Sequence, residues 1–166
     1  EPILTTSNGG QKEGLKVYLD PLMGFRYVPN QNIPGYSINK FGFRESFEPL
    51  DKRPKLFLLG GSSAFSLHIA NEQKTLSGRL REFLPQYQII NAGVIGFLSG
   101  QELGYMVHYL DEYNPKVYLS FSGFNDLNGQ IFPKTDVMKG YNRSIQMQIE
   151  RALQDACKNC SHNSKN

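Results

Sequence analysis

The chain has 166 residues, of which 39% are hydrophobic and 20% charged, a composition typical of one globular domain with a hydrophobic core. Eighteen basic and fifteen acidic side chains give a net charge of +3, which is too small and too scattered to indicate a nucleic-acid partner. Apolar runs are all much shorter than the roughly 20 residues of a transmembrane helix, so no membrane-spanning segment is expected.

The first third of the chain predicts a lead-in segment rather than a second domain. Residues 15–53 mix prolines and glycines with aromatic residues such as Phe25 and Tyr27, a pattern that favours turns. We therefore expect residues 1–53 to be irregular and to pack on a core domain at 54–166.

A regular alternation of strands and helices is predicted from Leu56 onward. Apolar runs predict strands, and apolar residues at helical spacing predict helices. The expected strands are 56–59, 87–90 and 117–121, and the expected helices are 76–84, 103–110 and 144–158. Alternation of this kind implies parallel strands joined by right-handed crossovers. The expected fold class is α/β, a flavodoxin-like three-layer α/β/α sandwich around a parallel sheet.

Small and polar residues follow each predicted strand. The three segments are Gly60-Gly-Ser-Ser63, Asn91-Ala-Gly-Val-Ile-Gly96 and Gly123-Phe-Asn-Asp126. The carboxyl ends of parallel strands meet at one edge of a sheet, where ligands bind. Together the segments supply an alcohol, a backbone N–H donor and a side-chain amide donor, the groups that acyl transfer needs.

On these segments the chain resembles the SGNH/GDSL hydrolase superfamily. The resemblance extends from about residue 20 to about residue 127, including lead-in segments at 20–30 and 41–44 that are similar to those of larger bacterial members. The three family blocks, Gly-Asp-Ser, a glycine and Gly-x-Asn-Asp, are matched by Gly60-Gly61-Ser62, Gly96 and Gly123-Phe-Asn125-Asp126.

The resemblance implies a serine ester hydrolase acting on a small-molecule or carbohydrate ester. Ser62 would attack an acyl or acetyl ester carbonyl and form an acyl-enzyme. The backbone N–H groups of Ser62 and Gly96 and the side-chain amide of Asn125 would form the oxyanion hole. The neighbouring Ser63 is interpreted as a hydroxyl that satisfies the turn or caps the following segment.

Three further residues are expected to support the loops. Gly60 and Gly61 allow a sharp turn after the first strand, although Gly61 replaces the aspartate of the first family block. Asp126 either orients the loop that carries Asn125 or caps a turn.

The family's fourth block, Asp-x-x-His, which supplies the general base, has no counterpart in this sequence. None of His68, His108 and His162 has an aspartate three residues before it. Three core strands are predicted, whereas the family uses about five, so we expect the chain to be truncated at the C-terminus and inactive alone. A shortened variant that covers its open sheet edge by forming a homo-oligomer is the alternative. His68, six residues after Ser62, is the candidate for a substitute base.

The same sequence bears on two other classes of function. A non-catalytic SGNH-like module that binds a glycan or acyl ligand uses the same residues without hydrolysis. A nucleotide cofactor is not expected, because residues 60–65 lack the dinucleotide fingerprint and the chain has no P-loop. Cys157 and Cys160 are interpreted as a local disulfide or as ordinary thiols, since two cysteines are too few for structural zinc, and no metal is expected.

Overall fold

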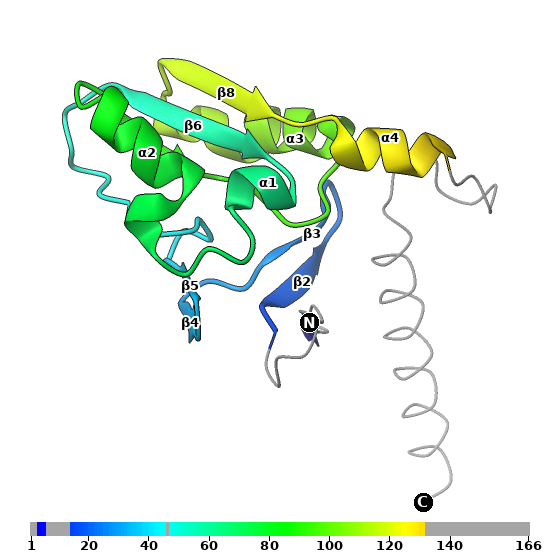
Figure 1. Cartoon of the computed structure of the whole chain (residues 1–166). Coiled ribbons are helices and arrows are strands. Elements are labelled where there is room, and N and C mark those ends of the chain that lie inside the picture. Colours follow the sequence, from blue (N-terminus) through cyan, green and yellow to red (C-terminus); the bar gives the residue numbers. More distant parts are fainter. Residues whose placement is uncertain (1–2, 6–13, 46, 132–166) are drawn as a thin grey trace, which may run out of the picture.

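The computed structural model describes residues 3–5, 14–45 and 47–131 and shows a mixed α/β fold (Figure 1). At its centre a three-stranded parallel sheet places β6 (Lys55–Gly60) between β7 (Gln88–Asn91) and β8 (Val117–Phe121). From Leu56 onward every residue of β6 is buried, which explains its unbroken apolar run. The prediction of an α/β fold with parallel strands is confirmed.

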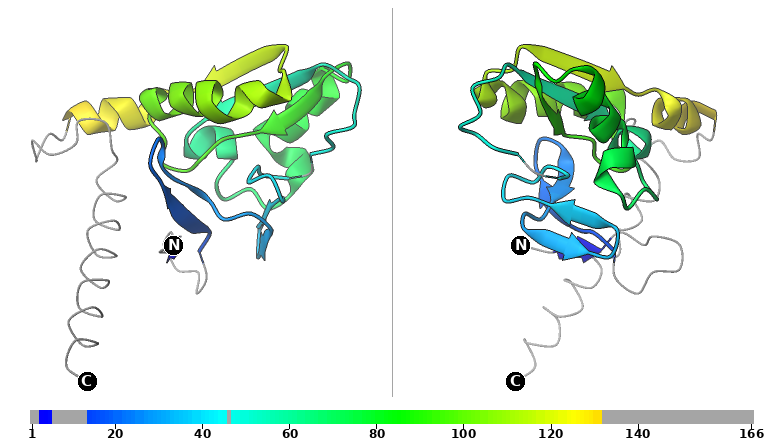
Figure 2. Two further views of the ribbon diagram at one scale, coloured as in Figure 1. Left: turned by 180° about the vertical axis from the view of Figure 1, so that it is seen from behind. Right: turned by 60° about the vertical axis from the view of Figure 1, so that its left-hand side comes forward.

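Helices flank the sheet on both faces. In Figure 1, α2 (Leu76–Phe83) lies in front of the sheet and α3 (Ser99–Tyr105) behind it, and Figure 2 shows α3 from its own side. The predicted helix at 76–84 is confirmed, with Thr75 accepting a hydrogen bond from the Gly78 N–H at its start.

The helix predicted at 103–110 begins earlier and ends differently. It starts at Ser99, where the Gln101 side chain accepts a hydrogen bond from the Leu98 N–H. After α3 the chain continues through a π-helical turn η2 (Met106–Leu110) and a 3-10 turn η3 (Asp111–Tyr113). The short elements α1 (Ser62–Phe65), η1 (Glu72–Lys74) and α4 (Phe124–Ile131) complete the core. The helix predicted at 144–158 lies outside the described residues.

The expectation of an irregular lead-in is wrong for residues 16–38. These residues form two antiparallel hairpins, and the strands of the lead-in are β1 (Ile3–Thr5), β2 (Lys16–Asp20), β3 (Gly24–Tyr27), β4 (Gln31–Ile33) and β5 (Tyr36–Ile38). Phe25 and Tyr27 alternate with less buried residues along β3, the two-residue period of a strand with one face on the core. Gly35 supplies the left-handed conformation, φ 89°, of the second hairpin's turn.

One hydrophobic core joins the lead-in to the sheet. Ring contacts connect the two parts, with centroid distances of 5.3 Å between Phe25 and Phe97 and 5.5 Å between Phe43 and Phe57. The lead-in therefore packs directly against β6 and the loop that follows β7.

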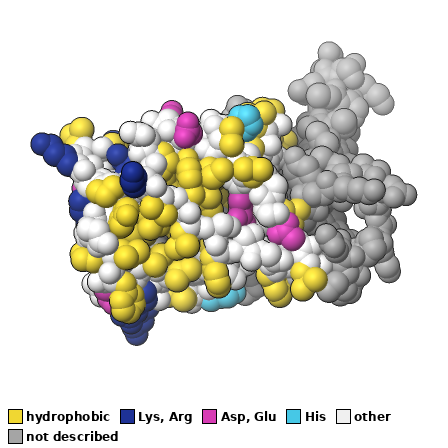
Figure 3. Space-filling view, turned by 90° about the horizontal axis from the view of Figure 1, so that it is seen from above, with side chains coloured by type: hydrophobic (Ala, Val, Ile, Leu, Met, Phe, Trp, Pro, Cys, Tyr) yellow, Lys and Arg dark blue, Asp and Glu magenta, His cyan; other side chains and the backbone are white. Residues whose placement is uncertain are grey.

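The outer edge of the sheet at β8 is apolar and open in the described part of the chain. There β8 pairs with β6 alone, and Leu119 and Phe121 are 38% and 56% exposed. Other exposed apolar residues on α3, η2 and α4 are Leu103, Val107, Phe124 and Leu127. From above, apolar side chains are spread across this face of the molecule (Figure 3). None of the described helices has the length and apolar character needed to cross a membrane.

Candidate functional site

A small hollow lies where β6 and β8 end. It encloses about 90 Å³ and is lined by Gly61, Ser62, Ser63, Phe97, Phe121, Ser122, Gly123, Phe124 and Asn125. The helices that follow β6 and β7 lie on opposite faces of the sheet (Figure 1), so the crossovers diverge at this edge. Open α/β sheets bind ligands at such a position.

The turn after β6 presents Ser62 to the hollow. Gly60 has φ 145°, and a Cβ there would collide with the Phe121 carbonyl oxygen and lie 2.6 Å from the Ala64 Cβ. Only glycine therefore lets β6 lie this close to β8 and lets α1 begin two residues later.

Ser62 and Ser63 both line the hollow but differ in burial. Ser62 is half-buried, whereas Ser63 is exposed. Within the described residues, neither hydroxyl makes a hydrogen bond, and the backbone N–H groups of both serines lack an acceptor, as expected in the first turn of a helix. The Ser62 hydroxyl is thus free to meet a ligand in the hollow.

Asn125 and Asp126 lie in the first turn of α4, not in a loop as expected. The Asn125 Nδ2 donates a hydrogen bond to the Phe97 carbonyl at 2.8 Å, which uses one of its two amide hydrogens. Asp126 accepts hydrogen bonds from the Ser99 N–H at 3.1 Å and the Ser99 hydroxyl at 2.7 Å. These contacts join the start of α4 to the start of α3 and fix the turn that carries Asn125.

Gly61 stands directly against Asn125. A Cβ on Gly61 would collide with the Asn125 Nδ2 and lie 3.4 Å from the Phe97 carbonyl oxygen. The space that a side chain at position 61 would enter is therefore filled by the Asn125 amide.

Gly96 lies beside the hollow and is not one of the residues that line it. It is buried, has φ 88°, and directly precedes Phe97, which forms a wall. The structure thus brings Ser62, Gly61 and Asn125 together at the hollow. Gly96 lies next to a wall residue and does not itself line the hollow.

Two side chains hold the loop that contains Gly96. Asn91 accepts a hydrogen bond from the Gly93 N–H and donates one to the Ala64 carbonyl, each at 3.1 Å. The Tyr27 hydroxyl accepts a hydrogen bond from the Ile95 N–H at 2.9 Å. Burial raises the pKa of Tyr27, so this phenol stays neutral and keeps its hydroxyl proton.

Among the described residues, no titratable side chain lines the hollow. His68 and His108 are both exposed and lie outside its walls, and the His68 N–H is held by the Tyr36 hydroxyl at 2.8 Å. In the part of the chain that the structure describes, no group of three side chains suited to a metal ion is present. His162, Cys157 and Cys160 lie outside the described residues.

Four of the wall residues are not predicted from the sequence as site residues, namely Phe97, Phe121, Ser122 and Phe124. Each is adjacent to a predicted motif or inside one. Only their position next to a motif could have indicated a role in the site, because aromatic residues after a strand are as common in cores as in ligand sites.

No family model matches this chain, and no curated protein matches it in sequence.

Proposed function

We propose that this hollow is the active site of a serine ester hydrolase of the SGNH/GDSL type, with Ser62 as nucleophile. The observation that carries the proposal is the convergence of Ser62 and Asn125, from two separate strand ends, on one hollow. The strand order β7-β6-β8 supports it, because this is how the flavodoxin-like order 2-1-3-4-5 begins, with its ligand crevice between the strands here called β6 and β8.

In the proposed reaction the Ser62 oxygen adds to the ester carbonyl, and the C–O bond to the leaving alcohol then breaks. Negative charge on the carbonyl oxygen is met by the Ser62 N–H and the second amide hydrogen of Asn125. The Gly96 N–H, which the resemblance implies as a third donor, is left out of this proposal because Gly96 does not line the hollow. Water hydrolyses the resulting acyl-serine and restores the enzyme. The Ser62 proton passes to a base and from it to the leaving alcohol, and in this proposal that base lies outside the described residues.

The volume of the hollow bears on the substrate. A space of about 90 Å³ with aromatic walls at Phe97, Phe121 and Phe124 favours a short acyl group such as acetyl over a long chain. The alcohol portion would be a small molecule or a carbohydrate that extends into solvent beyond the exposed Phe124.

A second candidate is a non-catalytic module that binds the same acyl or glycan ligand. One observation favours it: the absence of a titratable side chain from the walls among the described residues. A serine hydroxyl without an adjacent base is a poor nucleophile.

Labelling with a fluorophosphonate probe separates these candidates. In the full-length protein, the hydrolase proposal expects the probe to modify Ser62, identified by peptide mass spectrometry, with loss of labelling in Ser62→Ala and retention in the matched control Ser63→Ala. Labelling that persists in Ser62→Ala and disappears in Ser63→Ala would contradict the assignment. Absence of labelling, together with chemical-shift changes at residues 61–63 on adding an acetylated sugar, would favour the binding module.

Hydrolysis of a short aryl ester by this chain is a separate measurement. We expect negligible turnover, since no base lines the hollow in the described part. Rapid hydrolysis that is lost in Ser62→Ala would instead point to His68 as the base.

A further inference from the structure

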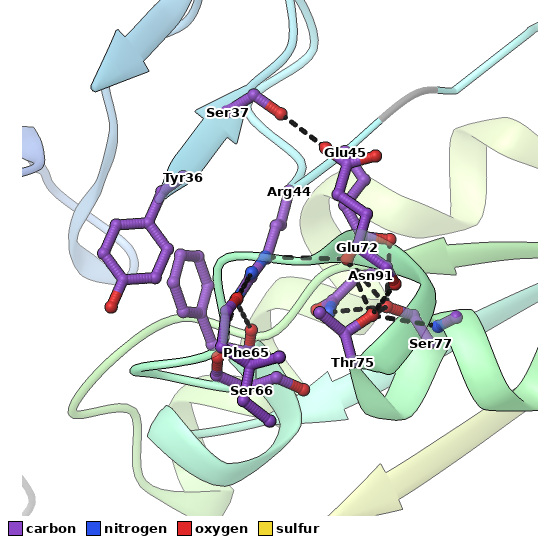
Figure 4. Close-up of polar contacts among 12 residues, drawn as sticks. Tyr36, Ser37, Arg44, Glu45, Phe65, Ser66, Glu72, Thr75, Ser77 and Asn91 are labelled. Atoms are coloured by element: carbon purple, nitrogen blue, oxygen red, sulfur yellow. Dashed lines mark hydrogen bonds and ion pairs between the residues drawn. The ribbon is translucent and has the colours of Figure 1, made fainter. Parts of the chain in front are cut away.

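Arg44 is the largest fully buried side chain, with 1% of its surface exposed. Its backbone N–H donates to the Asn91 carbonyl at 3.1 Å, at the end of β7. From there the side chain extends toward α1, and its guanidinium lies 5.1 Å from the Tyr36 ring centroid and 4.7 Å from that of Phe65 (Figure 4). A charged group so deeply buried needs strong partners.

Those partners are backbone carbonyls at the end of α1 and in the loop that follows it. Arg44 Nη1 donates to the carbonyls of Phe65 and Ser66, the latter at 2.8 Å, and Nη2 donates to the Ile69 carbonyl at 2.5 Å. The cation therefore sits where the last carbonyls of a helix would otherwise lack donors.

The segment that carries these carbonyls is hydrogen-bonded to the backbone of Ser62 and Ser63. The N–H of Ser66 donates to the Ser63 carbonyl and the N–H of Leu67 donates to the Ser62 carbonyl, each at 3.0 Å. Arg44 is thus connected through one backbone turn to Ser62, which lines the hollow.

The segment that Arg44 contacts, residues 65–69, contains backbone conformations that need support from their surroundings. Ser66 and His68 have φ 60° and 69°, left-handed values that non-glycine residues rarely adopt. Such conformations persist where surrounding contacts hold them, and Arg44 supplies contacts on both sides of His68.

A second arginine provides a comparison inside the same network. Glu45, itself buried, lies 3.5 Å from Arg44 Nε and 2.6 Å from Arg81 Nη1, and it also accepts hydrogen bonds from Thr75 and Ser77 (Figure 4). Arg81 donates to the Ile89 carbonyl and to none of the α1 carbonyls. Both arginines stabilise the buried carboxylate, and only Arg44 holds α1.

We propose that Arg44 is a positioning residue for Ser62: its guanidinium grips the carbonyls that end α1 and so fixes the nucleophile against Gly61 and Asn125. This role rests on the proposed function. The planar fork, with separate N–H groups for successive carbonyls, is what a lysine cannot reproduce.

The test compares Arg44→Lys with the matched control Arg81→Lys at a temperature where both are folded. The first readout is the second-order rate constant for fluorophosphonate labelling of Ser62. We expect a decrease of roughly 10- to 100-fold in Arg44→Lys, because small displacements of a reacting group have effects of this size, and a change of no more than about twofold in Arg81→Lys. Equal decreases in both variants, or none in Arg44→Lys, would overturn the proposal.

The second readout does not depend on reactivity. Amide hydrogen exchange at Ser66 and Leu67 reports the two bonds to the serine carbonyls, and we expect it to accelerate in Arg44→Lys and not in Arg81→Lys. If the full-length protein is not labelled at Ser62, the hydrolase proposal fails. Exchange still decides whether Arg44 holds α1, and similar exchange in both variants would refute that role.

A measurement on the unchanged chain covers the case in which Arg44→Lys does not fold. The Ser66 and Leu67 amides should be as protected as the Ala92 amide, which donates to the Leu58 carbonyl in the sheet. Rapid exchange at Ser66 and Leu67 with protection at Ala92 would contradict the proposal that Arg44 holds the end of α1 in place.

Discussion

Replacing Gly61 by alanine should displace the Asn125 side chain from its position beside the hollow. Gly61 has φ −82°, which is not the left-handed value that favours glycine, and the added methyl group meets two neighbours. That methyl collides with the Asn125 Nδ2 and is blocked on another side by the Phe97 carbonyl oxygen at 3.4 Å. Since the backbone oxygen is the more rigid neighbour, the Asn125 side chain must move, and its 2.8 Å bond to Phe97 is lost.

The size of the effect follows from that bond. A partly buried hydrogen bond contributes about 0.5–1.5 kcal/mol to the free energy of unfolding. A glycine-to-alanine change without steric conflict adds about 0.4–1 kcal/mol by restricting the unfolded chain. Gly100→Ala is the matched control, because no atom lies within 4 Å of a Cβ built there. The unfolded-state contribution is common to both variants, so Gly61→Ala should be less stable than Gly100→Ala by the lost bond, about 0.5–1.5 kcal/mol, or roughly 1–6 °C in Tm.

A double-mutant cycle with Asn125→Ala tests the cause. Thermal unfolding of the two single variants and the double variant should give a coupling free energy of about 0.5–1.5 kcal/mol, because the bond to Phe97 can be lost only once. Where Ser62 reacts with the probe, both single variants should also lower its rate, by as much as ~10²–10³ for a lost oxyanion donor. Additive stability effects, or a Gly61→Ala variant as stable as Gly100→Ala, would refute the reasoning.

Two other predictions concern the framework. Gly60→Ala should lower the free energy of unfolding by more than about 2 kcal/mol, because it combines a left-handed residue with a collision at the Phe121 carbonyl; a Tm within about 2 °C of the unchanged chain would contradict it. Burial raises the pKa of Asp20, but hydrogen bonds from backbone N–H groups, Tyr109 and Arg26 outweigh burial and lower it. The stabilisation from Asp20 is therefore present above its unfolded pKa of about 3.9 and is lost as the pH falls through its lower folded-state pKa. In Asp20→Asn, the fall in Tm between about pH 5 and pH 2 should be smaller, and an unchanged pH dependence would contradict the assignment.

Local pattern was enough to predict the central sheet and one of its covering helices. The apolar run at 56–59 is typical of a strand buried on both faces, and apolar residues at helical spacing that end before Pro85 predict α2. The motifs after the strands were expected to meet because parallel strands share a carboxyl edge, and Ser62 and Asn125 do line one hollow.

The lead-in hairpins and the setting of the site depended on tertiary structure. Pairing of β2 with β3 and of β4 with β5 is set by short aromatic alternations whose meaning appears only when one face meets the core. The collision between a side chain at position 61 and Asn125, and the grip of Arg44 on α1, join residues far apart in the chain. Sequence periodicity indicates which face of a helix or strand is buried. Which residues pack against that face depends on how the crossovers and the lead-in are arranged in the tertiary structure.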